Sequence, residues 1–279
     1  MARGRRRRCY VRGPSDFHKR GVRKVLAEYL GFFSRNGLGT FGFRWLHILV
    51  GIMWIGLLYY FNFVQVPAFA AFGDEAKARN IAIDKVARKA LWWFRWAAFS
   101  TFVTGILITV VTENYFYDGF GKSAGGIGIS VGMLLGTIMM LNVWGVIWRN
   151  QKVVLANAAN LLAGGEADPN AAAAGRKALM ASRQNTIFSV SMLFFMVYKG
   201  HGLTQGAELG GGAMGAFWLI TLVLIGVLEA NALGLMPWKT QPNKGLNILY
   251  DGPGVRNPLV AAFGLWVIFL ILTEIFFKF

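Results

Sequence analysis

Several uninterrupted apolar stretches, each close to the roughly 20 residues that a helix needs to cross a bilayer core, constrain this chain more than any other feature. Backbone groups in lipid must be hydrogen-bonded within the chain, so such stretches form helices rather than open strands. Candidate stretches lie at 42–66, 91–111, 127–148, 185–200, 214–235 and 259–277. We therefore expect an all-α, polytopic integral membrane helical bundle with about six transmembrane helices.

The composition supports this class. The chain is 55% apolar and 15% charged, whereas a soluble domain usually carries about 25% charged residues. A soluble enzyme, a secreted disulfide scaffold and a disordered chain are therefore excluded. Cys9 is the single cysteine of the sequence, so neither an intrachain disulfide nor a covalent c-type haem, which needs C-x-x-C-H, is expected.

Charge and helix propensity predict the domain organisation. The formal net charge is +16, and residues 1–41 hold 11 of the 29 Lys and Arg residues. We interpret 1–41 as a basic, partly disordered tail held at the bilayer by anionic lipid, and we expect no nucleic-acid partner because no nucleic-acid-binding fold accompanies it. Residues 42–279 form the transmembrane helical domain. Within it, 149–184 is expected to form extramembrane helices, because two segments rich in helix formers flank Pro169.

Two histidines are the main candidates for chemistry. His47 lies near the start of the first apolar stretch, and His201 lies just beyond the fourth. Counting spans places both on one side of the bilayer, although the even distribution of basic residues leaves the absolute orientation open. We expect His47 and His201 to be the axial iron ligands of a haem b, or part of another metal site. With a haem, Arg44 would pair with a propionate and Gly51 would leave room for the macrocycle. The alternative is that each imidazole is an interfacial residue bonded to water or carbonyls.

Other intramembrane residues have weaker interpretations. Glu229 is a candidate for a proton or ion-pair role, and Asn142 for a hydrogen bond between helices. Gly128, Gly132 and Gly136 recur at four-residue spacing, which favours the close approach of another helix over that of a cofactor.

Three patches carry a resemblance to a known family. Residues 44–56 (RWLHILVGIMWIG), residues 142–152 (NVWGVIWRNQK) and residues 182–201, which begin SRQNT and end at His201, occur in this order. Together they are similar to the membrane domain of the membrane-bound urate hydroxylase family, the urate oxidase N-terminal domain. The ordered set is more specific than any one of the patches.

The resemblance implies an all-helical membrane oxidoreductase that oxidises a purine and passes electrons to a c-type haem domain at its C-terminus. This sequence has no such domain, and it places Lys199 and Gly200 before His201 where the family usually has Asn. We therefore expect a membrane redox protein, in a bacterial inner membrane, that binds haem b and passes electrons to a separate cytochrome c. The alternative is a non-catalytic accessory or assembly subunit of a respiratory or photosynthetic membrane complex, so the pattern leaves open whether the chain is an enzyme. A transporter is less favoured because no inverted repeat is evident.

Overall fold

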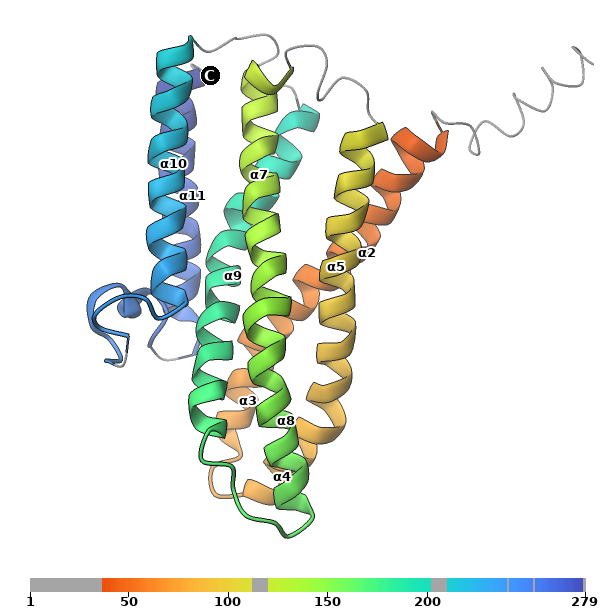
Figure 1. Ribbon diagram of the computed structural model, residues 1–279, viewed down its shortest axis with the longest axis vertical. Coiled ribbons are helices and arrows are strands. Elements are labelled where there is room, and N and C mark those ends of the chain that lie inside the picture. The colour runs from red at the N-terminus through yellow and green to blue at the C-terminus, as the bar shows by residue number, and fades with distance from the viewer. Residues whose placement is uncertain (1–36, 112–119, 202–209, 240, 253, 278–279) are drawn as a thin grey trace, which may run out of the picture.

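The computed structural model describes residues 37–111, 120–201, 210–239, 241–252 and 254–277. Over these residues the regular structure is helical, with no strand, and long helices lie side by side in a bundle (Figure 1). The prediction of an all-α membrane bundle is confirmed. Most of the predicted basic tail, 1–36, lies outside the described residues.

Several helices join end to end into long rods, some of them through a widened π-helical turn. In chain order the elements are η2 (Gly37–Gly42), α2 (Phe43–Tyr59), η3 (Tyr60–Gln65), α3 (Val66–Ala71), α4 (Ala76–Ala82), η4 (Ile83–Ala87), α5 (Arg88–Val111), η5 (Phe120–Lys122), α7 (Ala124–Leu141), η6 (Asn142–Ile147), α8 (Trp148–Leu162), α9 (Ala171–His201), α10 (Gly211–Ala232), η7 (Gly245–Leu249) and α11 (Arg256–Phe277).

Five helical rods of the described residues are long and apolar enough to cross a membrane: Gly37–Ala71, Ala76–Val111, Ala124–Leu162, Gly211–Ala232 and Arg256–Phe277. Helix α9 is different. The hydropathy pattern predicts a short helix at 185–200, but α9 is 31 residues long and polar over part of its length. It can be polar because it lies in the middle of the bundle, in contact with α2, α7, α8, α10 and α11 (Figure 1).

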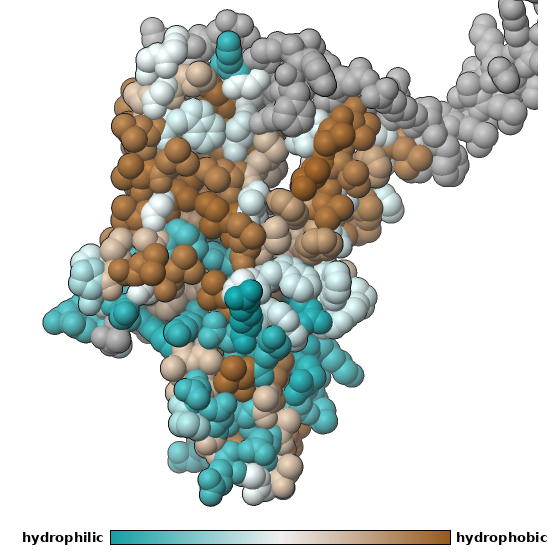
Figure 2. Space-filling model, in the orientation of Figure 1, coloured by the Kyte–Doolittle hydropathy of each residue, from teal (hydrophilic) through white to brown (hydrophobic). Residues whose placement is uncertain are grey.

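The bundle divides into an apolar half and a more polar half (Figure 2). The first three rods have 35, 36 and 39 residues, so each is more than about 50 Å long, against about 30 Å of hydrocarbon. Helices α10 and α11, with 22 residues each, are close to the bilayer thickness. The three long rods therefore exceed the thickness of the hydrocarbon core, and their lower ends, with most of 149–184, lie in the more polar half of the bundle as helices (Figure 2).

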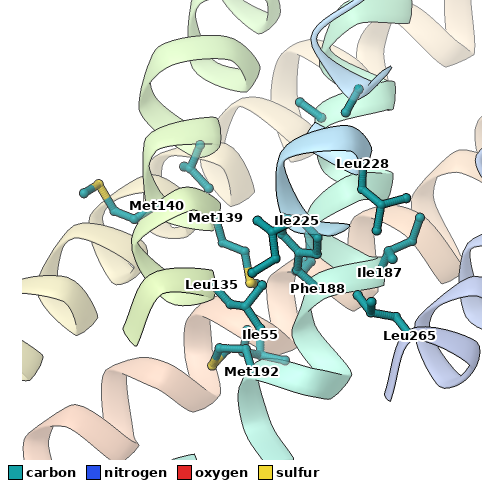
Figure 3. Close-up of a cluster of buried hydrophobic side chains, with 14 of the residues drawn as sticks. Ile55, Leu135, Met139, Met140, Ile187, Phe188, Met192, Ile225, Leu228 and Leu265 are labelled. Carbon is teal, nitrogen blue, oxygen red and sulfur yellow. The ribbon is translucent and has the colours of Figure 1, made fainter. Parts of the chain in front are cut away.

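The core between these helices is closely packed. Met139, Phe188, Met192, Ile225 and Leu265 interdigitate from α7, α9, α10 and α11 (Figure 3).

The glycines of α7 allow this packing. A methyl group at Gly132 would lie 3.2 Å from Cβ of Phe195, and one at Gly128 would lie 3.1 Å from the ring of Tyr198. The glycine stripe is therefore filled by α9 rather than by a cofactor.

Candidate functional site

Two of the three resemblance patches meet inside the bundle. The side-chain amide of Asn142 donates to Oδ1 of Asn185 at 3.1 Å and to Oε2 of Glu229 at 3.2 Å. Asn185 in turn donates to the carbonyl of Met139 at 2.9 Å. These contacts join α7 and η6 to α9 and α10, and Asn142 and Asn185 are both buried away from competing water.

Widened helical turns place asparagines against α9. Asn142 is the first residue of η6, and Asn62 lies within η3. Asn62 donates to the Leu58 carbonyl and to Oγ of Ser182, both at 2.9 Å. π-Helical turns are rare in proteins, and those that occur are often found at functional sites. One turn of α9, 182–185, is thus bonded from two neighbouring helices, and we define it as the polar turn.

The loop between α10 and α11 covers the polar turn. The Tyr250 hydroxyl is in hydrogen-bond contact with Oε1 of Gln184 and lies 3.0 Å from the Leu228 carbonyl. Arg183 donates to the carbonyls of Tyr250 and, at 2.9 Å, of Gly254. Burial raises the pKa of Tyr250, so its hydroxyl stays protonated and can donate at neutral pH.

An ion pair fixes the same loop to α9 from the water-exposed side. Arg176 forms two hydrogen bonds with the carboxylate of Asp251, one of them at 2.9 Å. The Asp251 carboxylate also accepts from the backbone N–H of Asn243 at 3.1 Å. Burial alone would raise the pKa of Asp251, but these hydrogen bonds and the charges of Arg176 and Arg183 lower it overall. Asp251 is therefore ionised at neutral pH.

His47 lies at the contact between α2 and α5. Its Nδ1 is 3.0 Å from Oγ1 of Thr104. The Thr104 hydroxyl has one proton, and it donates within its own helix, with the Ser100 carbonyl at 2.7 Å. With that proton on the Ser100 carbonyl, Thr104 can accept from Nδ1–H of His47, which would leave the imidazole lone pair on Nε2. This is the tautomer of a histidine that binds iron through Nε2 with a second residue holding its other nitrogen.

The other predicted site residues are placed less completely. Helix α9 ends at His201, at the end of the bundle where α2 begins (Figure 1), but the His201 side chain lies outside the described part of the chain. Arg44 is exposed on the first turn of α2. The room expected beside Gly51 is absent: a methyl group there would already contact Cγ2 of Thr101 at 3.8 Å, because α5 packs on this face.

Some residues of these networks carried no signal in the sequence. Thr104 is an ordinary threonine in an apolar helix. Tyr250 and Asp251 lie in a loop whose path past α9 depends on the tertiary fold. Arg183, Gln184 and Asn185 were indicated only by the family resemblance.

The fold and this site define the class: an integral membrane bundle with a buried polar turn in its central helix. Residues 109–229 match the family model described as urate oxidase N-terminal, which confirms the resemblance. The match includes Asn142 and the polar turn and ends at Glu229, whereas the 44–56 patch lies outside it. No curated protein and no solved structure matches the chain. Residues 109–229 are therefore similar to the urate oxidase N-terminal domain.

Proposed function

We propose that this protein is a redox protein of a bacterial inner membrane that binds haem b through His47 and passes electrons to a separate cytochrome c. The observation that supports it best is the hydrogen bond between Nδ1 of His47 and Oγ1 of Thr104, because a donating Nδ1 leaves Nε2 with the lone pair that an iron ligand needs. A bound haem would supply one-electron transfer.

The chain's own residues would hold and orient this group. Gly105 lets α5 approach the imidazole closely, since a methyl group there would lie 3.3 Å from Cε1 of His47. The ring is therefore fixed between α2 and α5. Arg44, less than one helical turn before His47, would pair with a propionate. His201 would be the second ligand, from the end of α9.

The test is an optical spectrum of the purified protein, oxidised and then reduced with dithionite. We expect a Soret band that His47→Ala abolishes, whereas His18→Ala, in the basic tail, leaves it unchanged. Thr104→Val should lower haem affinity by about 10- to 100-fold, the usual effect of losing the partner of a ligating histidine. The proposal is wrong if protein supplied with haemin shows no Soret band, or if His47→Ala keeps the full spectrum.

A second candidate function, a non-catalytic accessory subunit, is favoured by a different observation. Helices α4 and α8 and the first turns of α9 lie in the more polar half of the bundle (Figure 2). Outside the bilayer, their polar surface would be available to a partner protein. Native gels in mild detergent test this alternative: a subunit should migrate within a larger complex. Migration as a single 30.8 kDa chain would contradict it.

A further inference from the structure

Arg95 of α5 has no carboxylate partner among the residues that the structure describes. Its Cζ lies 3.8 Å from the ring centroid of Trp148 and 5.7 Å from that of Trp144. Within the described residues it forms no ion pair, and its buried Nε has no hydrogen-bond partner. Stacking on an indole favours a guanidinium, but it does not satisfy the N–H donors.

Arg88, on the same helix, is an arginine whose N–H donors have acceptors. It lies seven residues before Arg95, and both side chains reach toward α8. Arg88 donates to Asp84 at 2.6 Å and to the Leu155 carbonyl at 3.1 Å. Within the described part of the chain, Arg95 has neither kind of acceptor, so the difference between the two arginines lies in their positions on the helix.

Contacts between α5 and the neighbouring tryptophans hold the surroundings of Arg95 in place. The indole N–H of Trp144 donates to the Arg95 carbonyl at 3.0 Å, and the rings of Trp96 and Trp144 meet edge to face at 5.3 Å. The α5 backbone and the aromatic surface that carries the guanidinium are thus fixed to each other. Exposed Trp92 and Trp93 lie just before Arg95, as is typical of the interfacial level of a bilayer.

The surroundings of Arg95 change from polar to apolar at this point of the helix. Lys89 lies before it, and the stretch 97–111 after it contains no charged residue. Phe99, Ile106 and Val110 recur at helical spacing on the face that carries Arg95, and they are exposed. An anion bound here would have the interfacial tryptophans beside it and an apolar strip leading into the bilayer.

We propose that Arg95 binds the phosphate of an anionic glycerophospholipid, whose acyl chains lie along Phe99, Ile106 and Val110. The guanidinium matches a phosphate through paired N–H donors, and basic pockets between transmembrane helices bind anionic headgroups in this way. A free phosphate would use the same donors but would gain nothing from the apolar strip. The occupant is therefore a lipid.

Native mass spectrometry of delipidated protein, titrated with phosphatidylglycerol, phosphatidylcholine or inorganic phosphate, tests this site. Arg95→Gln should lower retention of phosphatidylglycerol by about fivefold, the effect of one basic residue near the surface. The matched control Arg79→Gln, at an exposed position on α4, should retain phosphatidylglycerol as the wild type does. Thermal shifts with the same ligands should rank the variants in the same order.

Three outcomes would overturn the proposal. These are equal retention of phosphatidylglycerol by Arg95→Gln and the wild type, equal retention of phosphatidylcholine by the wild type, and an equal thermal shift with inorganic phosphate. If Arg95→Gln does not fold, Arg95→Lys replaces it. Lysine keeps the positive charge but lacks the planar guanidinium with its paired N–H donors. This variant should therefore prefer phosphatidylglycerol over phosphatidylcholine more weakly than the wild type does. An unchanged preference would count against a phosphate held by the guanidinium.

Discussion

Asn142 at the start of η6 donates a hydrogen bond to Asn185 of α9 across 3.1 Å, and the two residues are 43 positions apart in the chain. Both amides are buried. Between membrane helices the hydrophobic effect gives little drive for association, since lipid is as apolar as a leucine side chain. Hydrogen bonds of this kind therefore select which helices pair and in what register.

Replacing Asn185 with Leu should destabilise the bundle. The substitution removes one of the two acceptors of Asn142 and leaves the Met139 carbonyl without its side-chain donor. Buried groups left unsatisfied cost about 1–3 kcal/mol. Reversible unfolding in detergent measures the change. Thr109→Val is the control, because the Thr109 hydroxyl donates to the Ile106 carbonyl of its own helix at an exposed position.

A double-mutant cycle separates this contact from the rest of the site. Asn142→Leu and Asn185→Leu should be non-additive by roughly 0.6–1.7 kcal/mol, the range measured for hydrogen bonds between membrane helices. Additive effects would mean that the two amides do not interact.

The apolar stretches predicted the position of most of the bundle because hydropathy reports directly on contact with lipid. Five rods meet this criterion in the described residues. Hydropathy did not mark residues 171–184 of α9, because Arg176, Arg183 and Gln184 interrupt the apolar pattern there. Their partners come from the α10–α11 loop and therefore cannot be deduced from α9 alone.

The site was predictable only where a single residue was unusual for its surroundings. Asn142 and Glu229 stand out in apolar helices, and the structure joins them at 3.2 Å. The tautomer of His47 depends on Thr104, 57 residues away, and no local pattern marks that pairing. Gly51 misled the prediction because a glycine that admits a neighbouring helix looks the same in sequence as one that admits a cofactor.

Gly132→Ala should destabilise the α7–α9 contact by about 1–3 kcal/mol, the usual cost of overpacking. Its methyl group would lie 3.2 Å from Cβ of Phe195 and 3.4 Å from the backbone nitrogen of Met196, and a backbone atom cannot rotate away. Gly226→Ala is the matched control, since nothing lies within 4 Å of that position. The control should be neutral or gain up to about 1 kcal/mol from helix propensity. Equal thermal stability of the two variants would refute the packing argument.

Arg183→Lys should loosen the α10–α11 loop while leaving the helices intact. The two terminal nitrogens of Arg183 reach the carbonyls of Tyr250 and Gly254 together, which a single ammonium group on a flexible chain does not reproduce. Hydrogen exchange by mass spectrometry should show faster exchange in residues 241–255, with α7 unchanged. Arg79→Lys, on the exposed face of α4, should leave the loop as protected as in the wild type.

Acid should weaken the attachment of this loop through Asp251. The pKa of Asp251 is lowered in the folded protein, so the folded state binds its proton less readily than the unfolded chain does. The stabilisation is complete above the ordinary aspartate pKa of about 3.9, and it is lost as the pH falls through the lower, folded value. Between pH 5 and pH 3 the wild type should therefore lose more thermal stability than Asp251→Asn, which has no carboxylate at this position to protonate. The variant should already be less stable than the wild type at pH 5, because its ion pair with Arg176 is gone. Asp74→Asn, at an exposed turn, is the control, and its thermal stability should fall with pH as steeply as that of the wild type. An equally steep fall for Asp251→Asn would show that other carboxylates cause the acid sensitivity.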